Sequence, residues 1–155
     1  MINPLCIDFL GSWNLERHID DFFDGKTGFF NGQVTISDCD KKWLYSETGL
    51  LTIESQVPLK SERKYLWSPN SYGFDIYFDN NQFFHKFKIP KNLYIDKSSA
   101  ARYVCHPDNY KVSYLLHNFP AWESVWHVMG PRKFYRIRSK YKRSDSKEID
   151  FCIDW

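Results

Sequence analysis

Apolar and polar residues alternate along most of the chain, and turn residues interrupt the alternation at intervals of roughly 8 to 15 positions. Successive side chains of a strand point to opposite faces of a sheet, so this pattern indicates strands with one apolar and one polar face. Helical periodicity is nearly absent. Many short strands separated by turns are typical of an all-β sandwich or barrel. No linker, repeat or change of composition divides the chain, so we expect a single β-barrel domain over residues 1–155.

The alternation predicts about nine or ten antiparallel strands in meander order. They are expected over residues 11–19, 27–37, 43–53, 63–67, 74–79, 83–89, 101–105 and 110–116, and as two long strands joined at Gly130-Pro131 within 122–143. Renewed alternation over 149–155 predicts a further strand or a segment packed across one barrel end. An up-and-down barrel removes exposed sheet edges and can enclose one small ligand. A sandwich is the alternative fold.

The charges of the segment 132–143 are sorted by position. Alternate residues form a basic face that we expect to be exposed to solvent: Arg132, Arg136, Arg138, Lys140 and Lys142. The opposite face carries Tyr135, Ile137 and Tyr141, and one charged residue, Lys133. A charge on an otherwise apolar face requires a partner or a function.

The same anomaly recurs in other predicted strands. Five ionisable residues fall on inward faces: Arg17, Glu47, Arg63, His85 and Lys133. Six tyrosines share those faces: Tyr45, Tyr65, Tyr103, Tyr110, Tyr114 and Tyr135. Ligand sites combine apolar walls with a few convergent polar groups, so these residues predict a polar site inside an aromatic cavity. Its walls are expected to include Trp67, Phe74, Phe78, Phe83 and Trp126.

Each of these polar residues also has a purely structural explanation. Arg17 could stack on Trp13 at the closed end of the barrel, and Glu47 could pair with Arg63. His85 could be a core histidine whose hydrogen bonds are satisfied. Lys133 could point out of the barrel mouth, Asp108 could cap a local turn, and Tyr110 and Tyr114 could be ordinary core residues. These explanations together require partners for many inward polar groups at once.

Composition and charge exclude several classes. The formal net charge of +2 is too small to indicate nucleic-acid binding, and no stacking platform accompanies the basic face. The four cysteines are scattered without a CxxC pair, so we expect reduced thiols in a cytoplasmic protein. No signal peptide or long apolar span is visible, so no membrane partner is expected.

Known catalytic and metal-binding motifs are also missing. The sequence has no phosphate-binding glycine loop, GxSxG, HExxH or calcium loop, and its five histidines lack metal-ligand spacing. We therefore expect no metal and no cofactor. Haem bound through His85 or Tyr103 is a minor alternative.

Six short segments, GSW, YSETG, ERKYLW, QFFHKF, CHPDNY and WHVMGPRKFY, resemble the uncharacterised DUF6314 family from Leu10 to Arg143. The most specific is the Gly-Pro-Arg-Lys turn after a Trp-containing strand, within 126–135. The resemblance implies a calycin-type barrel, similar in shape to lipocalins and fatty-acid-binding proteins, and it supplies no known activity. The family motif carries onto Glu47, Tyr65, Trp67, His85, Asp108, Tyr110, Gly130, Pro131 and Lys133. The family pattern has a histidine where this chain has Tyr103, so a ligand or reaction that needs that histidine would differ here.

Three functions remain open. The leading hypothesis is a barrel that binds a small aromatic or amphipathic molecule with an anionic group, because inward Arg63, His85 and Lys133 outnumber Glu47. Its predicted binding residues are Glu47, Arg63, Tyr65, Trp67, His85, Tyr103, Tyr110, Tyr114, Trp126, Lys133 and Tyr135. The second is an isomerase, dehydratase or lyase in which His85 is the general acid or base, oriented by Glu47. The third is an interaction module that uses the basic face. The sequence does not determine the oligomeric state.

Overall fold

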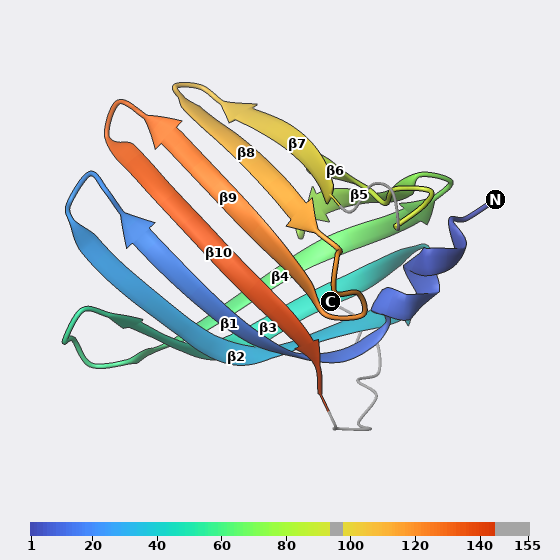
Figure 1. The fold of residues 1–155 in the computed structure, drawn as a ribbon, viewed down its shortest axis with the longest axis horizontal. Coiled ribbons are helices and arrows are strands. Elements are labelled where there is room, and N and C mark those ends of the chain that lie inside the picture. The colour runs from blue at the N-terminus through green and yellow to red at the C-terminus, as the bar shows by residue number, and fades with distance from the viewer. Residues whose placement is uncertain (94–97, 145–155) are drawn as a thin grey trace.

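The structure is a computed structural model that describes residues 1–93 and 98–144. Ten antiparallel strands form one strongly curved sheet that curls into a nearly closed barrel (Figure 1). The strands are β1 (Gly11–Asp21), β2 (Lys26–Cys39), β3 (Lys42–Ile53), β4 (Leu59–Asn70), β5 (Gly73–Phe78), β6 (Phe83–Lys88), β7 (Ser98–Cys105), β8 (Asp108–Leu115), β9 (Trp122–Gly130) and β10 (Lys133–Arg143). The predicted up-and-down barrel of nine or ten strands is therefore confirmed. The alternation over 149–155 lies outside the described residues.

The sheet has a seam between β6 and β7. The strand order is β6-β5-β4-β3-β2-β1-β10-β9-β8-β7, so β1 pairs with both β2 and β10. In the part of the chain that the structure describes, β6 and β7 are the two sheet edges. Aromatic side chains face each other across this seam: the Tyr103 ring of β7 lies 5.1 Å from Phe84 and 5.8 Å from Phe78.

A short 3-10 helix, η1 (Pro4–Phe9), covers one end of the barrel (Figure 1). The Asn3 side chain caps it by accepting a hydrogen bond from the Leu5 amide, and Pro4 suits the first helical position. Phe9 is fully buried and its ring contacts the rings of Trp67, Phe74, Phe87 and Trp122, among others. The alternation did not predict this helix, because six residues are too few to show a helical period.

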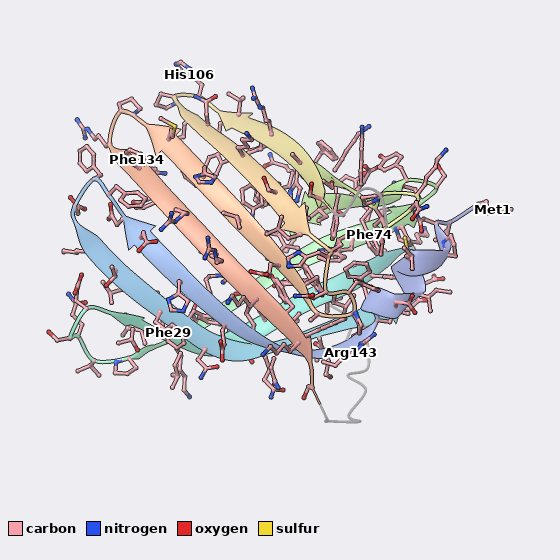
Figure 2. The ribbon with its side chains drawn as sticks, viewed as in Figure 1. Met1, Phe29, Phe74, His106, Phe134 and Arg143 are labelled. Atoms are coloured by element: carbon pink, nitrogen blue, oxygen red, sulfur yellow. The ribbon has the colours of Figure 1, made fainter. Side chains whose placement is uncertain are left out.

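Trp13 at the η1 end is covered by Arg143. The guanidinium carbon of Arg143 lies 4.1 Å from the centre of the Trp13 ring. Arg143 also donates hydrogen bonds to the carbonyl oxygens of Leu10, at 2.6 Å, and of Asp8. The hypothesis that Arg17 stacks on Trp13 is therefore wrong. Figure 2 shows Arg143 near η1 and Phe134 at the opposite end of β10.

The two faces of β10 are as predicted. Arg138, Lys140 and Lys142 are exposed, whereas Ser139 and Tyr141 between them are buried. Arg136 is partly covered because its Nη2 lies 2.9 Å from Oδ2 of Asp20 on β1.

The cysteines are not all reduced. Cys6 is buried and donates its thiol to the Gly73 carbonyl, and Cys105 is an exposed free thiol. Cys39 is disulfide-bonded, so the expectation of reduced thiols fails at this residue. In the described part of the chain, no helix is long and apolar enough to cross a membrane.

Candidate functional site

A cavity of about 170 Å³ lies inside the barrel. Trp67 and Trp122, which contact Phe9 of η1, form its floor, and Ile19, Leu51 and Tyr110 line it nearer the opposite ends of their strands. Other lining side chains are Arg17, Phe30, Tyr45, Glu47, Ser61, Arg63, Tyr65, Ile76, Phe84, His85, Tyr114, Ser124, Trp126, Val128, Ile137 and Tyr141. The interior is therefore an aromatic cavity that also contains several polar groups.

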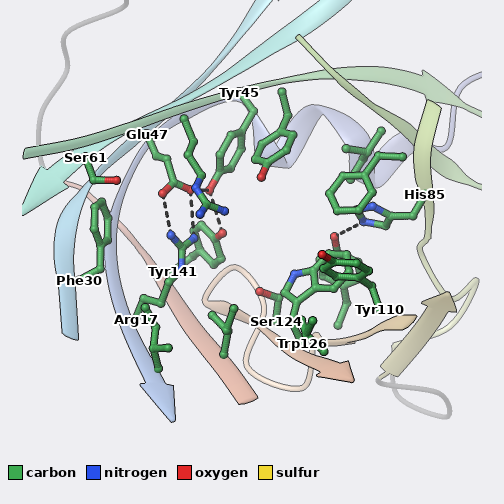
Figure 3. A pocket seen from close by; sticks show the side chains of 18 of the residues that line it. Arg17, Phe30, Tyr45, Glu47, Ser61, His85, Tyr110, Ser124, Trp126 and Tyr141 are labelled. Atoms are coloured by element: carbon green, nitrogen blue, oxygen red, sulfur yellow. Dashed lines mark hydrogen bonds and ion pairs between the residues drawn. The ribbon is translucent and has the colours of Figure 1, made fainter. Parts of the chain in front are cut away.

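The first polar group is a buried ion pair between β1 and β3 (Figure 3). Arg17 donates two hydrogen bonds to Glu47, from Nη1 to Oε2 at 2.7 Å and from Nη2 to Oε1 at 3.0 Å. Its Nε donates to the Ser139 hydroxyl at 2.8 Å. The Tyr45 hydroxyl donates to Oε1 of Glu47 at 2.8 Å, so the hydroxyl of Tyr141, 2.8 Å from that of Tyr45, must donate to it in turn. Two fixed donors thus hold Glu47, which is 1% exposed.

The protonation states of this network follow from burial and pairing. Burial opposes the charge of Arg17, but the hydrogen bonds and the negative charge of Glu47 keep its pKa above the usual value. Burial, with the nearby charge of Glu47, raises the pKa of Tyr45 well above 10, and burial also raises the pKa of Tyr141. At neutral pH Arg17 is charged and both tyrosines are neutral hydrogen-bond donors.

Paired glycines on β2 and β3 make room for a Phe30 ring that lies beside Arg17. Gly32 and Gly49 are direct cross-strand partners. A Cβ atom on Gly49 would lie 2.7 Å from the Phe30 ring and 2.4 Å from the Asn31 carbonyl oxygen. The Phe30 ring occupies that space and lies 5.2 Å from the Arg17 guanidinium carbon. Gly49 therefore permits close packing rather than forming the bulge or bend that a glycine in a strand can indicate.

The second polar group is the pair of His85 on β6 and Tyr114 on β8 (Figure 3). Nε2 of His85 lies 2.6 Å from the Tyr114 hydroxyl. Burial lowers the pKa of His85 to about 3 and raises that of Tyr114 well above 10, so both are neutral at pH 7. The rings of Phe84 and Trp126 make edge-to-face contacts with the imidazole, at 4.5 Å and 5.0 Å between ring centres. Within the described residues, Nδ1 of His85 is buried without a hydrogen-bond partner.

A β-bulge in β6 changes the predicted wall of the cavity. Ile76 pairs with His85 and Tyr77 pairs with Phe83, so Phe84 is an extra residue in β6. Phe84 and His85 consequently both line the cavity, whereas Phe83 is 48% exposed. The prediction of Phe83 as a cavity wall is wrong, because strict alternation does not hold across a bulge.

The structure brings most of the predicted site residues together. Those that line the cavity are Glu47, Arg63, Tyr65, Trp67, His85, Tyr110, Tyr114 and Trp126. Tyr103 lies at the seam instead, and Tyr135 is half-buried outside the cavity lining. The role of the lining residues in ligand binding stays a prediction.

Lys133 lies at the rim rather than in the cavity. Its Nζ is 3.0 Å from Oδ2 of Asp108, and hydrogen bonding to Asp108 raises the pKa of Lys133. Gly130 makes room for this carboxylate, since a Cβ atom there would lie 2.0 Å from Oδ1 of Asp108. Asp108 is therefore the partner of Lys133, which corrects the prediction that Lys133 contributes an inward charge.

Two predicted pairings are also wrong. Glu47 does not pair with Arg63, although they are cross-strand neighbours; it pairs with Arg17. Glu47 does not orient His85 either, because His85 bonds to Tyr114. Arg63 is exposed, lines the cavity, and has no carboxylate within ion-pair distance among residues 1–93 and 98–144.

Sequence reasoning missed several lining residues. Tyr141 was placed on the inner face of its strand but not in the site, since a tyrosine next to apolar residues gives no sign of a hydroxyl network. Ser124, which lines the cavity, and Ser139, which accepts a hydrogen bond from Arg17, are buried serines at inward positions of their strands. Of the described residues, no three or more His, Cys, Asp or Glu are grouped as a metal site would require.

Comparison with known proteins gives the family. Residues 9–143 match DUF6314, described as a family of unknown function. The chain belongs to DUF6314. No curated protein matches this DUF6314 chain in sequence. Its fold is similar to that of the S-type phycobiliprotein lyase CPES from Guillardia theta, with a TM-score of 0.63, 8% identity and 92% of each chain covered. The DUF6314 barrel is thus calycin-like in architecture.

Proposed function

We propose that this DUF6314 protein binds a small aromatic molecule that carries an anionic group. The observation that carries the proposal is an aromatic cavity with an excess of positive charge. Arg17 and Arg63 line the cavity, and Glu47 is their only carboxylate counterpart among the described lining residues.

The size of the cavity limits the ligand. An apolar protein cavity of about 150 Å³ holds a benzene molecule. A volume of about 170 Å³ therefore suits one aromatic ring with a few substituent atoms. Phe84 and Trp126, stacked 5.2 Å apart at 14°, offer ring faces and edges for such a ligand.

The residues that supply the positive charge in the structure are not the ones expected from the sequence. Lys133 is neutralised by Asp108 outside the cavity, and His85 is neutral because burial lowers its pKa to about 3. The excess charge now comes from Arg63, which is exposed and lacks a carboxylate partner in the described chain. An anionic ligand would balance it.

A cavity-filling variant tests this function. Ile137→Trp places a large ring in the cavity, and we expect it to abolish binding of single-ring carboxylates such as benzoate, measured by calorimetry and thermal shift. Arg138→Trp adds the same ring to the outer face of the same strand and should bind as the wild type does. Equal binding by both variants would contradict the proposal.

Acid–base catalysis is a second candidate because His85 and Tyr114 form a short hydrogen bond beside the cavity. Isomerisation, dehydration or lyase chemistry would suit such a pair. Conversion of bound compounds, followed by NMR, should then stop in His85→Gln while binding persists. An interaction module on the basic face of β10 would not need an interior cavity, so the cavity gives that third hypothesis no support.

A further inference from the structure

Glu47 has two arginines near it, and it forms its ion pair with the one whose strand is farther away in the sheet. Arg63 is its direct partner in the register of β3 with β4. Side chains at such paired positions start only about 5 Å apart, and opposite charges there usually attract. Glu47 instead bonds to Arg17 on β1, with β2 between them.

The burial of the three side chains explains why Glu47 pairs with Arg17. The Arg17 side chain is 14% exposed and that of Glu47 only 1%. Each would be an unpaired buried charge without the other, which is strongly destabilising. Arg63 is exposed and can keep its hydration without a carboxylate. Of the three side chains, Arg63 is therefore the one that can lack an ion pair with another described residue at the lowest cost.

We propose that Glu47 exchanges arginines when a carboxylate ligand binds: the ligand carboxylate takes the place of Glu47 on Arg17, and Glu47 turns to Arg63. This inference rests on the proposed function and names the anionic group as a carboxylate. The planar guanidinium of Arg17 already holds a carboxylate in a two-point arrangement, so it can accept another in the same geometry.

The exchange leaves every buried charge paired. Before binding there is one ion pair, Arg17–Glu47, and one hydrated cation, Arg63. After binding there are two ion pairs, ligand–Arg17 and Glu47–Arg63. The Tyr45 hydroxyl, which donates to Oε1 of Glu47, lies where it can donate to the incoming carboxylate instead. A neutral ligand cannot replace Glu47 on Arg17, because it would leave that charge uncompensated.

Two matched probes test the exchange. Benzoate and benzamide have nearly the same shape and differ in charge. In the wild type we expect benzoate to bind about tenfold more tightly than benzamide, measured by NMR titration or calorimetry. Arg63→Met should remove about that advantage, since Glu47 then has no second partner. Lys64→Met, on the opposite face of the same strand, is the control and should leave both affinities unchanged.

The decisive measurement is a double-mutant cycle. Glu47→Gln frees Arg17 from its internal carboxylate, so benzoate should bind about tenfold more tightly than to the wild type while benzamide is unaffected. In that background Arg63→Met should have no effect on benzoate. If Arg63→Met weakens benzoate equally with and without Glu47→Gln, Arg63 contacts the ligand directly and the exchange is wrong.

Other results separate this inference from the proposed function. If the wild type prefers benzoate but Arg63→Met leaves that preference intact, the proposed function stands and the exchange is wrong. If the wild type binds both probes equally, the anionic part of the proposed function fails together with the exchange. If neither probe binds, both fail. Should Glu47→Gln not fold, a structure of the wild type with benzoate decides: Glu47 within ion-pair distance of Arg63 supports the exchange, and Glu47 still on Arg17 overturns it.

Discussion

The Tyr114 hydroxyl lies 2.6 Å from Nε2 of His85, and both side chains are almost fully buried, at 5% and 3% exposure. Burial lowers the pKa of His85 from 6.5 to about 3, because a charged imidazole would lose its hydration. Tyr114 therefore has a neutral imidazole as its partner at all pH values near neutrality.

This relationship predicts a stability that depends on pH. The unfolded histidine takes up a proton near pH 6.5, whereas folded His85 resists protonation until about pH 3. Its contribution to stability is fully present above pH 6.5 and is lost as the pH falls from 6.5 towards 3, by up to about 1.4 kcal/mol per pH unit. Urea unfolding between pH 7 and 4 measures this, with His85→Gln as the reference. Parallel curves for the two proteins would show that folded His85 titrates normally.

Removing the His85 imidazole should reduce ligand affinity more than it reduces the stability of the fold. We expect His85→Ala to bind single-ring carboxylates about 1–3 kcal/mol more weakly, the usual cost of losing a buried hydrogen-bonding group. The fold should survive, since the site borders a cavity. Calorimetry and thermal unfolding check both points. Phe83→Ala, an exposed neighbour in the same strand, is the matched control. Unfolding of His85→Ala alone would favour a core role for His85.

Arg143 should stabilise the η1 end of the barrel through the planar shape of its guanidinium group as well as through its charge. Arg143→Lys keeps the charge but cannot cover the Trp13 ring and bond to the carbonyls of Leu10 and Asp8 together. We expect a loss of about 1–3 kcal/mol in the free energy of unfolding. Urea denaturation measures it, and Lys142→Arg is a control on the exposed face of the same strand. A lysine variant as stable as the wild type would show that charge alone is enough.

The basic face of β10 should tolerate a reversed charge. Arg138 is exposed and none of the ion pairs described for the chain includes it. Arg138→Glu should therefore change stability by less than about 0.5 kcal/mol. Arg136→Glu should cost more, up to about 1 kcal/mol, because Arg136 pairs with Asp20. Thermal or urea unfolding compares the two, and a loss of several kcal/mol in Arg138→Glu would mean that the faces of β10 are inverted.

Alternation predicted the barrel and most of the cavity wall because β3, β8 and β10 pair without interruption. In such strands the position of one residue fixes the faces of all the others. The bulge at Phe84 was not visible in the sequence, since it depends on how Ile76 and Tyr77 pair with the neighbouring strand. The face predicted for Phe83 was therefore wrong, whereas His85, just beyond the bulge, is buried as predicted.

The pairing of charges could not be read from strand patterns. The sequence placed Arg17, Glu47 and Arg63 inside the barrel, and the structure has all three lining the cavity. Which arginine Glu47 selects depends on burial and on contacts across β2, both of which are properties of the closed barrel. For the same reason Arg143, far from Trp13 in the sequence, was not recognised as its partner.

The pairing of β1 with β10 has a consequence for how the chain is made. Trp13 lies opposite Arg143, so the last described strand closes a ladder that the first one begins. During synthesis one edge of β1 stays unpaired until β10 has left the ribosome. Contacts of such long sequence separation slow folding, and an open strand edge invites pairing with other chains. A nascent or truncated chain that ends before β10 should therefore depend on chaperones, even though the finished barrel hides that edge.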